Sequence, residues 1–366
     1  MPAKEATPFS LELDRRVDEG ALGTLYEKLP DNQVRCYACA HRCLIKEGLR
    51  GICKVRYNRG GTLMVPRGYV GALQCDPIEK KPFLHAFPGT DALTFGMLGC
   101  DLHCSYCQNW VTSQALRDPG ALADPMDVTP RQLVDIARRE GASVVATSYN
   151  EPLITSEWAV EVFKAARPRG FSTAYISNGN ATKEVLEYIR PFTDLYKIDL
   201  KSFRDKNYRS LGGKLENILN GIQMVHEMGF WLEIVTLIIP GFNDSDEELG
   251  DVARFLSGLS PSIPWHVTAF HKDYKMQDPD NTTPETLLRA ARIGEEAGLH
   301  YIYAGNLPGR VGRYEDTRCP RCKTTLIRRI GYRIIEDRLS GRGSCFNCQQ
   351  QIPGVWRTTI NAGRAN

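Results

Sequence analysis

The middle of the chain alternates short apolar runs with amphipathic segments. Runs rich in Val, Ile, Thr and Tyr predict β-strands that are buried on both faces. They lie at 92–98, 143–149, 172–177, 195–200, 231–239, 265–270 and 301–305. Helix-start signals fall between the runs, at Thr129 with Pro130 and Gln132, at Ser245 and at Thr283. This alternation predicts an α/β protein with a parallel sheet and right-handed crossovers.

The number of strand–helix repeats leaves two architectures open, a doubly wound open sheet and a complete or partial (β/α) barrel. No Gly-x-Gly-x-x-Gly motif opens the series, which disfavours a dinucleotide-binding sheet. In barrels, functional side chains gather at the carboxyl ends of the strands. The second to sixth predicted strands end in SYNEP, SNGN, DLKS, PGFND and FHKDY, and Glu151, Asp199 and Lys201 among these are not typical turn residues. We therefore expect a site at this end of a partial TIM-type barrel.

Three groups of cysteines indicate that the protein also binds metal. Eleven of the twelve cysteines are clustered, and only Cys75 stands alone, where we expect a buried apolar thiol. Clustered cysteines in a reducing compartment indicate metal or cluster ligands rather than disulfides. The predicted organisation is a cysteine-rich N-terminal segment (1–90), the partial barrel (91–310) and a small β-rich, zinc-ribbon- or rubredoxin-like C-terminal domain (311–366).

The central group lies in GMLGCDLHCSYCQNW, directly after the first predicted strand. Cys100, Cys104 and Cys107 could bind three irons of a cubane cluster and leave the fourth iron open to another ligand. An open coordination position is typical of a catalytic metal site. The other interpretation is a closed zinc site that a distant fourth cysteine completes, and the spacing favours the open cluster.

The spacing Cys-x3-Cys-x2-Cys, with Tyr106 before the last cysteine, resembles the signature of radical S-adenosylmethionine (radical SAM) enzymes. The resemblance implies a partial or complete (β/α) barrel with a [4Fe–4S] cluster whose open iron binds S-adenosylmethionine. It also implies reductive cleavage of S-adenosylmethionine to a 5′-deoxyadenosyl radical, which abstracts a hydrogen atom from a substrate. A reductant such as flavodoxin or ferredoxin and a protein substrate are the implied partners.

The same resemblance assigns roles at the strand ends. Glu151 lies where the family has a Gly-Gly-Glu-like motif, and it would accept a hydrogen bond from the ammonium group of S-adenosylmethionine. ISNG (176–179), DLKSF (199–203) and LIIPGFND (237–244) resemble segments of glycyl-radical-enzyme activases of the pyruvate formate-lyase-activating type. Ile176 replaces an aspartate that helps those activases to hold a monovalent cation. The implied cofactor-binding residues are Tyr106, Glu151, Ser177, Asn178, Asp199, Lys201 and His271, and no catalytic residue is assigned.

A narrower resemblance, to the AmmeMemoRadiSam system radical SAM enzyme, extends over most of the chain. It is carried by 36–61, 76–89, 148–152, 265–274 and the C-terminal cysteine pairs. A fold transfers more safely than a substrate. The resemblance therefore implies radical chemistry on a protein or small molecule, conventionally activation of a glycyl-radical enzyme, with modification of a different substrate as the alternative.

The two flanking cysteine groups each offer four thiolates. The C-terminal group consists of Cys319, Cys322, Cys345 and Cys348. Zinc, or a single iron, would supply folding energy to a tail too small to build its own core. The N-terminal group consists of Cys36, Cys39, Cys43 and Cys53. Zinc is favoured there, and an auxiliary iron–sulfur cluster is the alternative.

Composition and charge argue against a nucleic-acid-binding protein, a membrane protein and an electron carrier. The formal net charge of +3 gives no argument for nucleic-acid or membrane binding. No stretch approaches the roughly 20 apolar residues that span a bilayer, and the N-terminus does not resemble a signal peptide, so we expect a cytoplasmic protein. A non-catalytic multi-zinc protein that binds nucleic acid would be more basic, and an electron carrier would not need a barrel of this size.

Overall fold

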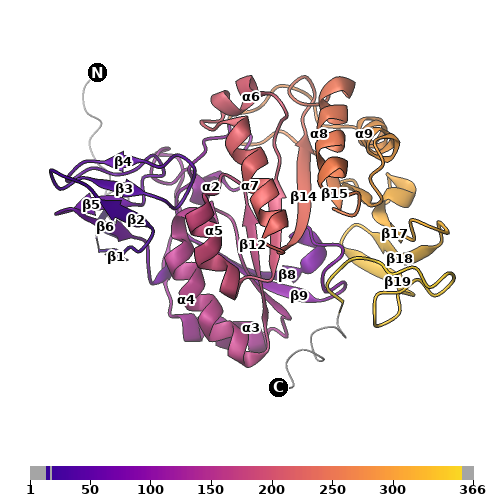
Figure 1. Ribbon diagram of the computed structural model, residues 1–366, viewed down its shortest axis with the longest axis horizontal. Coiled ribbons are helices and arrows are strands. Elements are labelled where there is room, and N and C mark those ends of the chain that lie inside the picture. Colours follow the sequence, from indigo (N-terminus) through magenta and orange to yellow (C-terminus); the bar gives the residue numbers. More distant parts are fainter. Residues whose placement is uncertain (1–13, 17–18, 357–366) are drawn as a thin grey trace.

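An eight-stranded sheet forms the centre of the computed structural model, which describes residues 14–16 and 19–356 (Figure 1). The order is β16-β15-β14-β13-β12-β11-β9-β8, and every neighbouring pair is parallel except β8 and β9. The strands are β8 (Ala72–Pro77), β9 (Asp91–Gly96), β11 (Val144–Thr147), β12 (Ser172–Ser177), β13 (Leu195–Asp199), β14 (Trp231–Ile238), β15 (Trp265–Ala269) and β16 (Ile302–Gly305). This mostly parallel α/β sheet fits the predicted partial TIM-type barrel.

All seven predicted strands are confirmed, with ends that differ by two residues or fewer. The eighth strand, β8, was not predicted because it is a half-exposed edge strand whose residues, ALQCDP, do not form an apolar run. Cys75 lies on β8 and is half-buried rather than buried, because this edge of the sheet is partly open to solvent.

Helices connect the parallel strands, as the capping signals predicted. They are α3 (Pro130–Arg139), α4 (Ser156–Ala166), α5 (Lys183–Ile189), α6 (Asp205–Ser210), α7 (Leu215–Glu227), α8 (Asp246–Leu259) and α9 (Pro284–Glu296), with the short α2 (Trp110–Ser113) after β9. Thr129 and Gln132 form a complete capping box at α3. The hydroxyl groups of Ser245 and Thr283 accept the N–H groups of Glu248 and Thr286 at α8 and α9.

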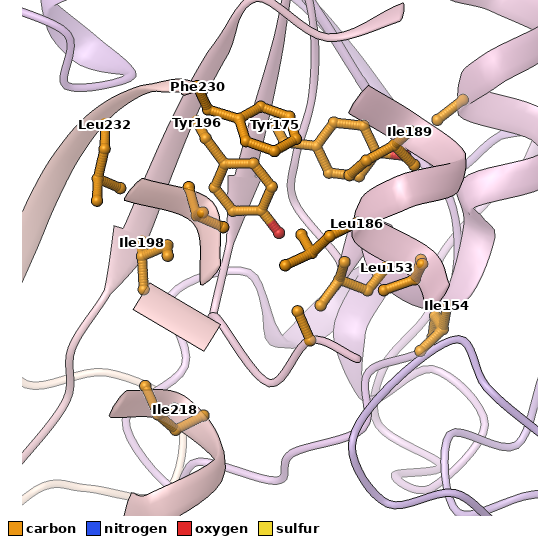
Figure 2. Packing of buried hydrophobic residues seen from close by; sticks show 14 of the residues in the cluster. Leu153, Ile154, Tyr175, Leu186, Ile189, Tyr196, Ile198, Ile218, Phe230 and Leu232 are labelled. Carbon is orange, nitrogen blue, oxygen red and sulfur yellow. The ribbon is translucent and has the colours of Figure 1, made fainter. Parts of the chain in front are cut away.

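Aromatic rings fill the space between the sheet and its helices (Figure 2). Tyr175 of β12 stacks on Tyr196 of β13 with ring centroids 5.7 Å apart, and Phe230 meets Tyr196 edge-on at 5.4 Å. Leu186 and Ile189 of α5 belong to the same buried cluster. Each such side chain stabilises the fold by about 1.5–3 kcal/mol when it is fully buried, so this layer stabilises the strands that carry the site.

The N-terminal segment builds small antiparallel sheets at one end of the molecule (Figure 1). These are β1 (Ala21–Leu22), β5 (Tyr57–Arg59) and β6 (Thr62–Val65); β2 (Tyr26–Lys28), β3 (Val34–Cys36) and β4 (Leu44–Ile45); and β7 (Tyr69–Val70) with β10 (Met126–Asp127). A buried ion pair joins this segment to α4, because both terminal nitrogens of Arg56 lie 2.7 Å from the Glu157 carboxylate.

The C-terminal segment forms the antiparallel strands β17 (Thr317–Arg318), β18 (Thr325–Ile330) and β19 (Arg333–Asp337) at the opposite end (Figure 1). It docks on the connection between β8 and β9. Arg329 Nη2 donates to the Leu84 carbonyl at 2.9 Å, and Val355 N donates to the His85 carbonyl at 2.7 Å. The His85 ring lies 2.7 Å from the Pro353 carbonyl and 2.6 Å from the Tyr303 hydroxyl.

The remaining elements are single 3-10 turns: η1 (Ile78–Lys80), η2 (Pro152–Thr155), η3 (Arg167–Arg169), η4 (Arg190–Phe192) and η5 (Gly312–Glu315). Across residues 14–16 and 19–356, no helix combines the length and the apolar character that crossing a bilayer requires.

Candidate active site

A cavity of about 420 Å³ lies at the carboxyl ends of the parallel strands. Parallel strands end at one edge of a sheet, so residues far apart in the sequence meet there. All but one of the sequence-predicted cofactor and central-cluster residues line this cavity: Cys100, Cys104, Tyr106, Cys107, Glu151, Ser177, Asn178, Asp199 and Lys201. The C-terminal sheet and its preceding turn close one side of the cavity through Tyr314, Glu315, Gly331 and Tyr332.

The three central cysteines lie on one loop that the surrounding structure fixes. The loop is anchored by His103 N, which donates to the Leu211 carbonyl at 2.9 Å, and by its Ser105 carbonyl, which accepts from Lys275 N at 2.9 Å. Gly99 begins the loop with a φ of +89°, and a Cβ atom there would lie 2.9 Å from the Cys53 carbonyl oxygen. Only glycine fits this turn, because it tolerates positive φ and has no side chain.

Polar groups lie close to two of the three central thiols. Leu102 N donates to Cys100 Sγ at 3.4 Å, and the Ser113 hydroxyl lies 3.2 Å from Cys107 Sγ. Burial raises the pKa of Cys104 to about 11, so the thiolates need a bound metal to form at neutral pH. Among the described residues, these thiols belong to no group of three or more ligands whose donor atoms all lie within 4.8 Å of one another.

Glu151 lies at the start of η2, at the end of β11, and is 2% exposed. Its Oε1 accepts the Ser177 hydroxyl at 2.7 Å and Leu153 N at 3.1 Å, and its Oε2 accepts Asn178 N at 2.7 Å. Burial, followed by the nearby charge of Asp101, raises the pKa of Glu151 to about 8. A cationic group in the cavity would favour the ionised form of this carboxyl.

Asp101 is a site residue that sequence reasoning missed. It is fully buried directly after Cys100, and its two oxygens accept from the side-chain amides of Asn178 and Asn180, each at 2.7 Å. The feature that could have identified Asp101 is its acidic side chain directly after Cys100, a predicted cluster ligand. Through Asn178, Asp101 connects the cysteine loop to Glu151.

Lys197 is the second missed residue. Its Nζ lies 2.5 Å from Asp199 Oδ1, and Lys201 Nζ lies 3.7 Å from Asp199 Oδ2. Burial would raise the pKa of Asp199, but the charges of Lys197 and Lys201 outweigh it, so that pKa is lowered. Lys197 lies inside the apolar run of β13, two residues before Asp199, so both side chains face the cavity.

His271 lies apart from the other predicted residues. It is exposed, it lines a neighbouring hollow rather than this cavity, and its Nε2 is 2.9 Å from Gln108 Nε2. Ile176, which replaces the expected cation ligand, lines the cavity itself.

The C-terminal thiols converge on one point. Cys319 and Cys348 Sγ lie 3.6 Å apart, as do Cys322 and Cys345 Sγ, and all four atoms lie within 4.8 Å of one another. Zn–S bonds of about 2.3 Å place tetrahedral thiolates roughly 3.8 Å apart. The four thiols therefore have the geometry of a site for a single tetrahedral ion.

Comparisons with known proteins show which proteins this chain resembles. The sequence profile of the Radical SAM superfamily matches residues 95–256. The chain is 37% identical over 306 residues to the uncharacterized protein MJ0808 of Methanocaldococcus jannaschii, covering 83% of this chain and 90% of that protein. It is 25% identical over 237 residues to the pyruvate formate-lyase 1-activating enzyme of Escherichia coli K12, covering 59% and 93%.

One solved structure, of a domain of the pyruvate-formate lyase-activating enzyme from Bacteroides vulgatus, matches 45% of this chain and 100% of that domain. Its sequence identity is 24% and its TM-score is 0.39.

Proposed function

Because this chain belongs to the radical SAM superfamily and is similar to pyruvate formate-lyase-activating enzymes, we propose that its cavity is the site of reductive S-adenosylmethionine cleavage. Cys100, Cys104 and Cys107 would hold the [4Fe–4S] cluster. When bound, the cluster and S-adenosylmethionine supply one-electron cleavage of a sulfonium bond and abstraction of a hydrogen atom from the substrate. The observation that carries the proposal is a loop of three thiols facing a cavity that also holds Glu151 and Asp199.

The carboxylates of the cavity would bind and orient S-adenosylmethionine. Glu151 would accept a hydrogen bond from its ammonium group, while Ser177 and Asn178 keep the carboxylate in place. Lys201 would place positive charge near Cys104, whose pKa it lowers against the larger effect of burial. Tyr314 and Tyr332 line one side of this cavity.

In our proposal the substrate is a protein or a small molecule, and a one-electron donor such as flavodoxin or ferredoxin supplies the electron. Activation of a glycyl-radical enzyme is the conventional substrate assignment and is supported by relatives at about 25% identity. Modification of a different substrate is the alternative, since MJ0808, at 37% identity, is itself uncharacterized. The reaction would take place in the reducing cytoplasm, where free thiols persist.

We also propose that the C-terminal thiols bind structural zinc or a single iron, on the strength of their tetrahedral spacing. The docking of this sheet on 84–87 means that the ion would stabilise one wall of the cavity as well as the sheet itself.

The test is an assay for 5′-deoxyadenosine after anaerobic reconstitution with iron and sulfide, reduction and addition of S-adenosylmethionine. Cys104→Ala should abolish the product. Cys75→Ala is the matched control, because Cys75 lies on edge strand β8, and it should leave the yield unchanged. The electron paramagnetic resonance spectrum of the reduced wild type should also change when S-adenosylmethionine is added. A central site filled with zinc, or a spectrum that S-adenosylmethionine leaves unchanged, would contradict the proposal.

A further inference from the structure

We propose that the ammonium group of Lys197 supplies the positive charge that binds the carboxylate of S-adenosylmethionine, so that this protein needs no monovalent cation in its cavity. This role of Lys197 rests on the proposed function, in which S-adenosylmethionine is the ligand of the cavity. It adds the group that binds the carboxylate of that ligand, and it separates this chain from activases in which an aspartate, here Ile176, helps to hold a cation.

Ile176 and Lys197 lie side by side on neighbouring strands. In the register of β12 and β13, Ile176 is paired with Lys197, and both residues line the cavity. Residues in register on adjacent strands project from the same face of a sheet. An apolar side chain therefore stands where a cation would need an acidic ligand, and an ammonium group comes from the strand beside it.

The carboxylate of Asp199, at the end of β13, already has two cationic partners. Lys197 Nζ lies 2.5 Å from Asp199 Oδ1, and Lys201 Nζ lies 3.7 Å from Asp199 Oδ2. A monovalent cation such as K⁺ is held by oxygen atoms that replace its hydration shell. Both oxygens of Asp199 face an ammonium group instead, so these residues do not fit a monovalent cation.

The positive charge of Lys197 is not fully balanced within the protein. Two ammonium groups share the single carboxylate of Asp199. Lys197 is 5% exposed, so water screens its charge weakly. Burial lowers the pKa of Lys197, whereas the charge of Asp199 raises it. An anionic group of a bound ligand would therefore favour the ammonium form and complete the balance.

Glu233 of β14 does not supply the missing negative charge, although it is in register with Lys197. Its oxygens accept the backbone N–H groups of residues 84 and 85, each at 3.0 Å, and Trp231 Nε1 at 3.0 Å. His266 Nε2 lies 2.7 Å from its Oε2. This carboxylate is thus engaged by four partners, and it lies outside the lining of the cavity.

The amino-acid end of S-adenosylmethionine carries one positive and one negative group, and the cavity offers a partner for each. Glu151, at the end of β11, is the proposed partner of the ammonium group. Lys197 and Lys201 present positive charge from β13 and the residues that follow it. Only β12 separates β11 from β13 in the sheet, a distance of about 10 Å between strand axes. The long Glu and Lys side chains can therefore reach adjacent groups of one ligand.

The dependence of S-adenosylmethionine binding on monovalent cations tests this inference without any variant. Equilibrium dialysis measures the Kd of labelled S-adenosylmethionine for the anaerobically reconstituted wild-type protein. The Kd should agree within about twofold in potassium, sodium and tetramethylammonium chloride at equal ionic strength. A larger weakening when potassium and sodium are both absent would overturn the inference.

Lys197→Met should weaken the binding of S-adenosylmethionine by roughly 10- to 150-fold, the loss expected for a hydrogen bond between charged groups. Decarboxylated S-adenosylmethionine lacks the group that Lys197 would bind, so its Kd should be the same for this variant and the wild type. Lys81→Met is the matched control. Lys81 also lines the cavity, is 6% exposed and lies 2.9 Å from Asp76, which keeps Lys80 at 3.0 Å. This control should leave the Kd of both ligands unchanged.

Thermal unfolding of the same samples separates loss of binding from loss of folded protein. A folded Lys197→Met protein that binds S-adenosylmethionine as tightly as the wild type would overturn the inference. Equal weakening of both ligands would also overturn it, because a purely structural role of Lys197 affects them alike. Failure of the proposed function would look different: the reconstituted wild type would not bind S-adenosylmethionine in any of these salts.

Discussion

Glu151→Gln should weaken S-adenosylmethionine binding by roughly 10- to 150-fold. The carboxylate accepts three hydrogen bonds, two at Oε1 and one, from Asn178 N, at Oε2. A glutamine can keep the two at its oxygen, but its amide group would then face the Asn178 N–H, and two donors cannot pair. The variant also loses the negative charge. The proposed bond between the ammonium group of S-adenosylmethionine and the Glu151 carboxylate joins charged groups. Such a hydrogen bond contributes about 1.5–3 kcal/mol, which corresponds to the roughly 10- to 150-fold change in affinity.

Glu248→Gln provides the matched control. Glu248 is 4% exposed, and it too accepts a serine hydroxyl and a backbone N–H, from Ser202 and Phe203. It lies at the first turn of α8, outside the lining of the cavity. Both bonds end on Oε1, so a glutamine can keep them at its amide oxygen and buries its NH₂ group in place of Oε2. The same chemical change should therefore lower the stability of the fold by about 1–3 kcal/mol, through that buried NH₂ donor, and leave the affinity for S-adenosylmethionine unchanged.

Equilibrium dialysis with labelled S-adenosylmethionine, on anaerobically reconstituted proteins of equal iron content, measures both effects as changes in Kd. Thermal unfolding of the same samples separates loss of binding from loss of folded protein. A Kd for Glu151→Gln within twofold of the wild type would refute the assigned role of Glu151. Equal weakening in Glu248→Gln would show that the loss arises from general destabilisation.

Three further predictions concern the parts of the structure that support the site. Arg56→Met should lower the free energy of unfolding by about 3–5 kcal/mol, because it leaves Glu157 buried and unpaired; adding Glu157→Met should restore most of it, as measured by urea unfolding, and no restoration would contradict this. Burial lowers the pKa of His85 to about 4. Between pH 6.5 and 4 the unfolded chain therefore binds a proton that the folded chain does not, and acidification should remove about 3 kcal/mol of stability. His85→Gln should lose this part of the pH dependence, and an unchanged pH profile would contradict the assignment. Removal by a chelator of the metal that we propose at the C-terminal thiols should speed hydrogen exchange at residues 84–87, where the C-terminal sheet docks; unchanged exchange would show that the sheet stays docked without the ion.

The parallel strands could be predicted from the sequence because burial on both faces demands long apolar runs, as in β12 and β14. β8 could not, because an edge strand needs no such run. The three-cysteine loop and Glu151 were identified from a spacing and a strand end. Asp101 was missed because its partners, Asn178 and Asn180, become neighbours only when separate strand ends meet. Lys197 was missed because it lies inside the apolar run of β13, two residues before Asp199. Spacing alone also left the metals open, since it does not determine how far apart the sulfur atoms stand in space.

The wall contributed by Tyr314, Glu315, Gly331 and Tyr332 bears on the order in which the protein matures. Domains fold as units during synthesis, with the N-terminal parts first. Residues 312–332 are made after every strand of the large sheet, so we expect a nascent chain that has completed β16 to hold the cysteine loop in a cavity with one side missing. Cofactor delivery through that gap is possible until the C-terminal sheet docks. The ion that we propose at the C-terminal thiols would then control how long the gap stays open.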